Sequence, residues 1–499
     1  MAAQATVAAA TLRGVEALPV DVEVSVGAGM PGFAIVGMAD ASVQESRERV
    51  RAAIRSCGFS MPTSKIVVNL APGALRKTGS GFDLPIAVGI LCATGQVDPT
   101  VAQRALFVGE LSLEGAVRPV AGLLAHALLA KARGADLVCA AEAAVVPIEG
   151  LARRGMRSLA DLRELPIPEA GTAVRSTRPA QLDFRDIAGH DMAKRALQIA
   201  AAGGHGVLMM GPPGSGKTML ASRLPSILLP LSRAEALEAA VVHSVAGEDA
   251  AAPLAGVRPF RNPHHSASLA GLVGGGSPVR PGEISLAHHG VLMLDEIAEF
   301  SPSVLQGIRQ PLEAGRVVIT RADGTVALPA RFMLVAASNP CPCGYYGDDE
   351  RPCACTERQV RAYRSRIGGP VLDRIDVHID VRRIPPAQVL ATGRGTSSAT
   401  LREGVQAARA FAAWRRAHGD VPTDAGAERT PEGLVAACGL AADDVRFLEA
   451  MAEAGHLSGC AIVRTLALAR TIADMEERAA VTRDHLCEAV GFRLREVRP

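Results

Sequence analysis

Eight residues near the middle of the chain combine glycines, a lysine and a hydroxyl at a spacing that suits phosphate chemistry. They run Gly-Pro-Pro-Gly-Ser-Gly-Lys-Thr and fit the pattern G-x-x-x-x-G-K-[ST] at every fixed position. Glycines let successive backbone N–H groups point at phosphate oxygens, and the next helix adds its positive N-terminal end. We expect Lys217 to reach the β- and γ-phosphates and Thr218 to bind Mg²⁺. The predicted phosphate-binding residues are Gly211, Pro212, Pro213, Gly214, Ser215, Gly216, Lys217 and Thr218.

The flanking sequence favours a phosphate loop over an ordinary glycine-rich turn. An apolar run at residues 207–210 predicts a buried strand before the glycines, and the pattern of residues 219–229 predicts a helix after them. This strand–loop–helix order is what a phosphate loop requires, so we expect the chain to bind ATP.

Two carboxylates end a second buried-strand pattern at residues 290–296. Asp295 offers the oxygen ligand that Mg²⁺ prefers, and Glu296 is placed to polarise an attacking water as a general base. A buried strand that merely ends in surface acids is the alternative. Because a phosphate loop lies upstream, we favour ATP hydrolysis with Mg²⁺ as cofactor.

A third buried-strand pattern begins at residue 334 and ends at Asn339. An amide here would orient the hydrolytic water against the γ-phosphate, as in the sensor 1 of AAA+ ATPases. A strand-end turn is the alternative, since Asn-Pro is itself a turn signal.

Two further segments resemble parts of AAA+ sites. Residues 372–376 are similar to the arginine-finger segment of ring-forming AAA+ proteins, which implies that Arg374 enters a neighbouring subunit's site and offsets charge on the γ-phosphate. A surface salt bridge of Arg374 with a nearby aspartate is the alternative. Ile187 and Gly189 lie where AAA+ proteins cradle the adenine.

Four cysteines lie within fifteen residues as two C-x-C pairs: Cys341, Cys343, Cys353 and Cys355. In a reducing compartment four thiolates suffice for a tetrahedral zinc site. The usual C-x-x-C spacing is absent, and an iron–sulfur cluster is the alternative metal centre. Four unligated thiols would oxidise easily. Because the cluster lies between Asn339 and Arg374, we expect it to fix where Arg374 is presented.

Basic side chains lie in two segments that we expect to contact DNA. A glycine-rich segment, residues 258–282, precedes the acidic strand, and residues 316–328 predict a β-hairpin about an Asp-Gly turn. Their arginines would neutralise backbone phosphates. A long surface loop is the alternative for the first segment. The predicted DNA contacts are Arg258, Arg261, Arg280, Arg316 and Arg321.

The elements that must position these residues divide the chain into four parts. Residues 1–163 mix strands and helices, including an alternating strand at 20–26 and an apolar helix at 84–93. Residues 164–181 are Pro-rich and predict a linker. Residues 182–385 alternate strands with helices, which indicates an α/β core with a parallel sheet. Residues 386–499 predict a helical domain.

Composition excludes few classes of protein. The chain has 499 residues, a net charge of +2 and ten cysteines. The near-neutral charge means that any DNA contact depends on local basic patches. The sequence predicts neither a membrane span nor a secretory signal, so we expect a cytoplasmic protein with reduced cysteines.

The chain resembles the magnesium-chelatase-like AAA+ family, in particular its ComM (YifB) subfamily. The resemblance covers nearly the whole sequence and is carried by GMPGFAIVGMADASVQESRERVRAAI, KTGSGFDLPIAVGIL, RPFRNPHHSASLAGLVGGGSPVRPGEISLAHHG and the stretch from NPCPCGYYG to LDRID. It implies an N-terminal Lon-protease-like (S5-like) α+β domain, a P-loop AAA+ core and a C-terminal helical lid. It also implies a homo-oligomeric, hexameric motor on branched or single-stranded DNA, a branch-migration helicase in DNA uptake, with recombination proteins as further partners.

Two departures from the family pattern bear on function. Gly81 appears at the position of the Lon-like nucleophile, Ser80 is adjacent, and the lysine position falls near His126, so we expect no proteolysis. Cys460 replaces a lid arginine of the sensor 2 helix. Arg464, one turn on, is the expected substitute in nucleotide binding.

Three other functions stay open on the sequence. They are a chelatase-type motor subunit that remodels a protein partner, a regulated AAA+ protease, and an ATP-switched scaffold that binds DNA without moving it. Gly81 disfavours the protease. The fused N-terminal domain and the cysteine cluster favour the DNA motor over the chelatase subunit.

Overall fold

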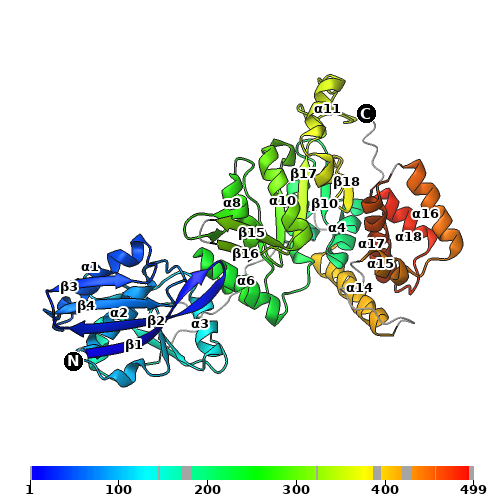
Figure 1. Ribbon diagram of the computed structural model, residues 1–499. Coiled ribbons are helices and arrows are strands. Elements are labelled where there is room, and N and C mark those ends of the chain that lie inside the picture. The colour runs from blue at the N-terminus through cyan, green and yellow to red at the C-terminus, as the bar shows by residue number, and fades with distance from the viewer. Residues whose placement is uncertain are drawn as a thin grey trace.

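The computed structural model describes residues 3–143, 147–169, 182–321, 324–385, 395–418, 430–455 and 457–493. Three parts follow one another across Figure 1: an N-terminal sheet domain in blue, a central sheet domain in green, and a C-terminal group of helices in orange and red. The predicted linker, residues 164–181, lies mostly outside the described residues.

The N-terminal domain is built on a seven-stranded sheet with the order β3-β4-β2-β1-β5-β8-β9. Its strands are β1 (Ala3–Arg13), β2 (Glu16–Gly27), β3 (Gly32–Val36), β4 (Lys65–Ala71), β5 (Ala105–Phe107), β8 (Asp136–Ala140) and β9 (Arg153–Met156), and a short pair, β6 (Glu110–Leu111) and β7 (Val117–Arg118), lies apart. In β2 the predicted alternation is confirmed, because Val20, Val22 and Val24 are buried between exposed carboxylates.

Three helices accompany this sheet: α1 (Ala41–Ser56), α2 (Asp83–Ala93) and α3 (Leu123–Ala132). Every residue of α2 is buried, as its continuous apolar sequence predicts. Gly89 permits its close approach to the sheet, because a Cβ there would lie 2.6 Å from a methyl group of Val24.

The central domain has a five-stranded sheet with the order β11-β14-β17-β10-β18, in which every pair is parallel. The strands are β10 (Val207–Met210), β11 (Phe260–Arg261), β14 (Val291–Leu294), β17 (Met333–Ser338) and β18 (Val377–Asp380). The predicted α/β core with a parallel sheet is therefore confirmed. Because parallel strands all point the same way, their carboxyl ends form one edge, where such sheets bind ligands.

Helices and a hairpin surround the central sheet. The helices are α4 (Asp191–Gly203), α5 (Lys217–Arg223), α6 (Arg233–Ala246), α7 (Ala251–Leu254), α8 (Leu269–Val273), α9 (Glu283–Leu286), α10 (Pro302–Ala314), α11 (Glu357–Ser365) and α12 (Gly369–Leu372). A short antiparallel pair, β12 (Gly274–Gly275) and β13 (Arg280–Pro281), follows α8. The predicted hairpin is present as β15 (Arg316–Arg321) and β16 (Gly324–Pro329), although its two turn residues lie outside the described part.

The C-terminal part is helical, as predicted, and packs against the central domain. Its helices are α14 (Ser398–His418), α15 (Pro431–Cys438), α16 (Ala442–Ala454), α17 (Gly459–Met475) and α18 (Arg483–Gly491). Helices α14 and α17 both contact α4, and a buried ion pair of 3.0 Å between Arg415 and Asp474 joins them. No helix within the described ranges has the length and apolar character needed to cross a bilayer.

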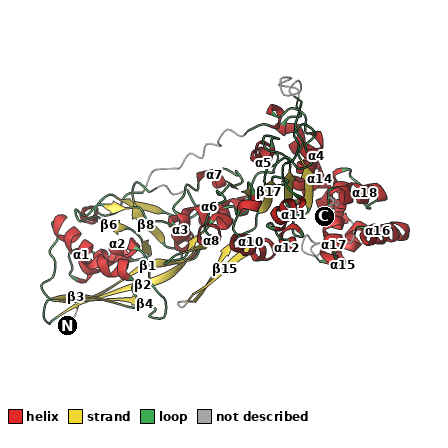
Figure 2. Ribbon diagram, turned by 90° about the horizontal axis from the view of Figure 1, so that it is seen from above, coloured by secondary structure: helices red, strands yellow, loops and turns green. Residues whose placement is uncertain are grey.

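The N-terminal domain packs on the central domain through α3, α6 and the hairpin, which lies between the two domains in Figure 2. The backbone N–H of Gly122 donates to the carbonyl of Ser244 at 2.7 Å, and Arg13 donates to the carbonyl of Thr325 at 3.3 Å. Apolar side chains of α3 and α6, including Leu124 and Val241, form a small core between them. The described domains are thus joined by direct packing.

Candidate active site

The glycine-rich loop lies between β10 and α5, as the sequence predicts for a phosphate loop. Gly214 and Gly216 have positive φ angles of 77° and 91°, which glycine adopts without strain. A Cβ on Gly211 would lie 2.1 Å from the carbonyl oxygen of Val381, so only glycine fits there. The buried hydroxyl of Ser215 has no hydrogen-bond partner among the described residues, as expected of a group that awaits a ligand.

The two predicted magnesium ligands meet at the carboxyl edge of the sheet. The hydroxyl of Thr218, in the first turn of α5, donates to Oδ2 of Asp295, just after β14, at 2.7 Å. A hydroxyl and a carboxylate at this separation form the hard-oxygen donor set that suits Mg²⁺, and both are at hand for phosphate oxygens. The residues therefore fit a Mg²⁺–nucleotide group.

Lys217 and Asn339 also come together. The Lys217 ammonium donates to the carbonyls of Gly211 at 2.8 Å and Pro212 at 3.0 Å, and to Oδ1 of Asn339 at 3.3 Å. Burial lowers the pKa of Lys217, while the charge of Asp295 acts in the opposite sense. The ammonium is thus held over the loop by neutral oxygens that phosphate oxygens are able to replace.

Glu296 has an unusual backbone. Its φ is +52°, in the left-handed region that side chains other than glycine, Asn and Asp seldom adopt, and its N–H bonds to Oδ1 of Asp295 at 3.0 Å. Such a backbone often marks a functional position.

His265 was missed by the sequence interpretation, which treated its segment as a basic loop. Its Nδ1 lies 3.8 Å from Oε2 of Glu296. The sequence carried no periodic signal for this contact, because β11 is only two residues long. In the structure β11 runs parallel to β14 and leads to the same edge.

The predicted adenine region lies beside the phosphate loop. Ile187 is buried, and its carbonyl accepts from the Lys194 ammonium at 2.6 Å. Gly189 has a φ of +61°, and the ring of the next residue, His190, approaches Gly216. The predicted role of Ile187 and Gly189 at the adenine stays a prediction.

Arg374 lies at the opposite edge of the sheet from the phosphate loop of its own chain. Its carbonyl is near Gly206, which precedes β10, whereas the loop follows that strand. The guanidinium pairs with Glu313 of α10 and donates to the carbonyl of Pro370 at 2.6 Å. A role at its own site is therefore not supported, and the role at a neighbour's site stays a prediction.

The structure does not place Arg464 at the phosphate loop. Its guanidinium donates to Oδ1 of Asp376 at 2.6 Å, and Oδ2 of the same carboxylate accepts from the N–H of Gly206 at 3.0 Å. Both contacts lie at the amino end of β10. In this structure the partner of Arg464 is thus Asp376, and its expected part in nucleotide binding stays a prediction.

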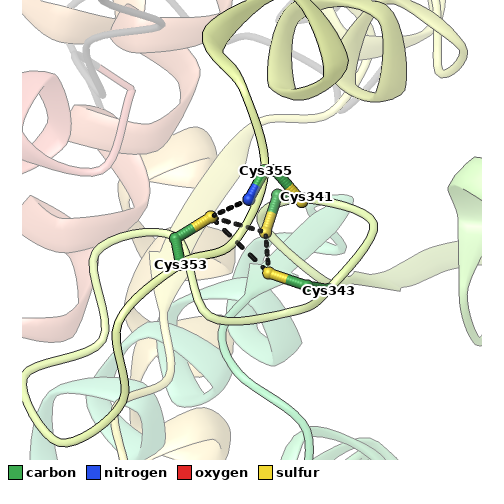
Figure 3. Close-up of side chains that lie close together, drawn as sticks. All are labelled: Cys341, Cys343, Cys353 and Cys355. Atoms are coloured by element: carbon green, nitrogen blue, oxygen red, sulfur yellow. Dashed lines mark hydrogen bonds between the residues drawn. The ribbon is translucent and has the colours of Figure 1, made fainter.

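The four cysteines form a compact cluster directly after Asn339 (Figure 3). The Sγ atoms of Cys341, Cys343 and Cys353 lie 3.4–3.6 Å apart, and Cys355 completes a set within 4.8 Å. A tetrahedral zinc site with Zn–S bonds of about 2.3 Å has S–S edges of about 3.8 Å, so the cluster has the right dimensions. Backbone N–H donation from Tyr345 lowers the pKa of Cys343 to about 6, whereas at Cys353 and Cys355 backbone N–H donation is outweighed by burial and the neighbouring thiols, which raise the pKa. Without a metal, the four thiols therefore favour one thiolate, at Cys343.

The cluster contacts the phosphate loop. A Cβ on Gly344 would lie 2.6 Å from Cδ of Pro213, and the carbonyl of Pro340 accepts from Arg364 at 3.2 Å. The cluster therefore contacts the phosphate loop and Asn339, and its expected effect on Arg374 stays a prediction.

A second group of potential metal ligands, Glu238, His288 and His289, has chemistry that argues against a metal. Nδ1 of His288 accepts the backbone N–H of Arg331 at 3.0 Å, so the proton of the neutral ring is on Nε2. That Nε2–H faces Glu238 at 3.2 Å and is no lone pair for a cation. The group is a hydrogen-bonded link between α6 and β14.

Comparison with known proteins now identifies the family. Residues 183–389 match the family described as magnesium chelatase, subunit ChlI, residues 22–143 match subunit ChlI of Mg-chelatase, and residues 395–493 match its C-terminal family. The chain is 41% identical over 492 residues to the protein YifB of Salmonella typhimurium, which covers 96% of this chain and 95% of that protein. The chain belongs to the magnesium-chelatase-like AAA+ family.

Other relatives refine this placement. The competence protein ComM of Haemophilus influenzae is 41% identical over 496 residues, with 96% of this chain and 95% of ComM covered. The magnesium-chelatase 67 kDa subunit of Chlorobaculum parvum is 30% identical over 167 residues, which is 32% of this chain and 23% of that subunit. The full-length matches place the chain in the ComM/YifB subfamily, as the sequence motifs indicate.

The predicted DNA contacts of this AAA+ protein fall into two groups. The side chain of Arg258 is 12% exposed and donates to the carbonyls of Leu229 and His289, and Arg261 pairs with Glu283 at 2.7 Å. These two arginines support the fold, so the structure does not favour their predicted role. The arginines that are exposed are Arg280, Arg316 and Arg321.

The residues at the predicted Lon-like nucleophile and lysine positions have hydrogen-bond partners of their own in the N-terminal domain. The Ser80 hydroxyl donates to Glu110, and Nδ1 of His126, in a buried ring, donates to the carbonyl of Gly122 at 2.9 Å. Both residues line one hollow, together with Gly81, and its described lining holds no lysine. The expected absence of proteolysis agrees with these contacts but stays a prediction.

Proposed function

We propose that this chain is an ATP-hydrolysing, ring-forming DNA motor that moves branch points in recombination intermediates. The observation that carries the ATPase part is the convergence of Thr218, Asp295, Lys217 and Asn339 at one edge of the central sheet. Membership in a family of AAA+ ATPases supports the same activity.

Each residue at this edge has a separate role in the proposed hydrolysis of ATP. Bound Mg²⁺ supplies positive charge to the phosphate oxygens, and Thr218 and Asp295 would hold it. When nucleotide binds, the Lys217 ammonium leaves the loop carbonyls and pairs with the β- and γ-phosphates. Its positive charge then offsets the negative charge that develops on the leaving group. Asn339 orients the attacking water, and Glu296 accepts its proton.

Two observations support DNA as the substrate. Arg280, Arg316 and Arg321 are exposed on β13 and the hairpin, where they are free to contact phosphates. A relative that aligns over nearly its full length is named a competence protein. The ring, the homo-hexamer and the recombination partners are part of the same proposal.

We also propose that the cysteine cluster holds zinc as a structural metal. Elemental analysis of the purified chain should give about one zinc per chain, and Cys343→Ser should lose it. Iron in that analysis, with visible absorbance, would show a cluster of the alternative kind instead.

A labelled four-way junction tests the motor. Purified protein with ATP should separate the strands of the junction. Lys217→Ala should lower the ATPase rate by about 10²-fold or more, since the ammonium that pairs with the phosphates is lost. Lys131→Ala, which removes an exposed lysine from α3, is the matched control. Junction binding without separation would favour the ATP-switched scaffold, and hydrolysis without DNA binding would favour a motor that remodels a protein partner.

A further inference from the structure

We propose that His265 is a positioning residue for Glu296, the base in the proposed ATPase reaction on which this inference rests. Its imidazole would hold one carboxylate oxygen, Oε2, and leave Oε1 to face the attacking water. The starting observation is the 3.8 Å separation of Nδ1 and Oε2.

The topology of the sheet brings these two residues together. Strand β11 pairs in parallel with β14, in the register Phe260 with Val291 and Arg261 with Leu292. Both strands therefore end at the same edge, where β14 delivers Glu296 and β11 leads into the segment that holds His265. Of the strands in this sheet, β14 is the one that β11 neighbours.

The segment that holds His265 is fixed by its own contacts. Arg261 pairs with Glu283 at 2.7 Å before it, and Ser268 caps α8 after it through a bond to the N–H of Gly271 at 3.1 Å. Between them, Nδ1 of His264 lies 2.8 Å from the hydroxyl of Ser266, and the rings of His264 and His265 are 4.0 Å apart. The imidazole of His265 is thus presented by an ordered turn.

The contacts described above leave the Glu296 side chain without a group that fixes the orientation of its carboxylate. Its side chain is 51% exposed, and its backbone is held in the left-handed region with a φ of +52°. A flexible, solvated carboxylate presents an oxygen to water only part of the time, whereas a base oriented by a third group is ready for proton transfer. At 3.8 Å the contact is longer than a hydrogen bond, and such contacts tighten when substrate closes the site.

Steady-state ATP hydrolysis by the full chain tests this role. We expect His265→Ala to lower kcat by about tenfold to a hundredfold, with the KM for ATP within about twofold, because phosphate binding does not involve His265. His265→Gln retains a side-chain N–H donor and should recover most of the loss. His418→Ala removes an exposed imidazole at the end of α14, outside the phosphate-binding edge, and is the matched control.

A double variant separates positioning from a structural effect. In a Glu296→Gln background, measured by single-turnover hydrolysis, His265→Ala should cause no further loss, since the base it positions is gone. An undiminished loss in that background, no recovery with His265→Gln, or a kcat of His265→Ala close to that of the unaltered chain would overturn the proposal. If the unaltered chain hydrolyses ATP and Lys217→Ala does not, the proposed ATPase stands in each of these cases; if the unaltered chain does not hydrolyse ATP, both fall.

Discussion

A buried imidazole lies just before β14, the strand that leads to Asp295, a proposed Mg²⁺ ligand. His288 is 2% exposed, its Nδ1 accepts the N–H of Arg331, and its Nε2 faces Glu238. Burial, followed by the charge of His289, lowers the pKa of His288 to about 4. Protonation of Nδ1 would also turn its hydrogen bond with Arg331 into a contact between two donors.

The lowered pKa predicts a pH dependence of stability. The unfolded chain binds a proton on His288 near pH 6.5 and the folded chain only near pH 4, so stability present above pH 6.5 is lost as the pH falls toward 4. The contribution is about 1.4 kcal/mol per pH unit between these values. Thermal unfolding between pH 7.5 and 5 should show a flatter pH dependence for His288→Gln. His264→Gln, at an exposed ring, is the control, and parallel curves for all three proteins would contradict the assignment.

At the scale of elements, Asp376 joins the helical domain to the central sheet. Its carboxylate pairs with Arg464 of α17, accepts the N–H of Gly206 and lies 3.5 Å from His205. Burial alone would raise the pKa of Asp376, but the hydrogen bond with His205 and the charge of Arg464 hold it well below its usual range.

Asp376→Asn should loosen this junction. The variant leaves the Arg464 guanidinium without its charged partner at a carboxylate position that is 10% exposed, so we expect a loss of about 3 kcal/mol in the free energy of unfolding. Denaturant unfolding measures the loss, and limited proteolysis should show earlier cleavage within the C-terminal helices. Asp373→Asn, at a carboxylate three residues away, should behave as the unaltered chain.

The loop that carries the four cysteines, residues 341–355, contacts the phosphate loop and forms a second junction between elements. Gly344 has a φ of +86°, and a Cβ there would collide with Pro213. We expect Gly344→Ala to weaken nucleotide binding by about tenfold, because the methyl group displaces the phosphate loop. Gly347 shares the left-handed backbone, with a φ of +76°, but has open space around its Cβ position, so Gly347→Ala is a control for backbone strain alone. Equal nucleotide dissociation constants for both variants would contradict the proposed contact.

At the scale of the whole molecule, the proposed arginine-finger role of Arg374 requires two chains. Arg374 lies near the amino end of β10, at the opposite edge from the phosphate loop that it would serve. One chain therefore has a phosphate loop at one edge and Arg374 at the other, as the proposed head-to-tail ring requires.

A mixture of two inactive variants tests this arrangement. Lys217→Ala retains the arginine and Arg374→Ala retains the lysine, so random mixing in a ring creates intact sites at about a quarter of the interfaces. ATP hydrolysis should be low for each variant alone and rise on mixing to a measurable fraction of the unaltered rate. Hydrolysis at the full rate by Arg374→Ala alone would contradict a shared site.

The sequence by itself determined the parts of this protein whose chemistry is local. A phosphate loop is eight consecutive residues, and two apolar runs reveal buried strands together with the polar residues at their ends, Asp295 and Asn339. The α/β core, the hairpin and the C-terminal helices were predictable from the same short-range periodicity.

The tertiary structure decided which distant residues meet. His265 with Glu296, Gly344 with Pro213, and Arg464 with Asp376 are pairs far apart in the chain. Of the arginines expected on DNA, Arg258 instead binds carbonyls and Arg261 a carboxylate. Hydrophobic periodicity assigns a residue to a strand or a helix but does not order the strands in a sheet. The order β11-β14-β17-β10-β18 is set by packing of the whole domain, and it determines which side chains are neighbours along the carboxyl edge.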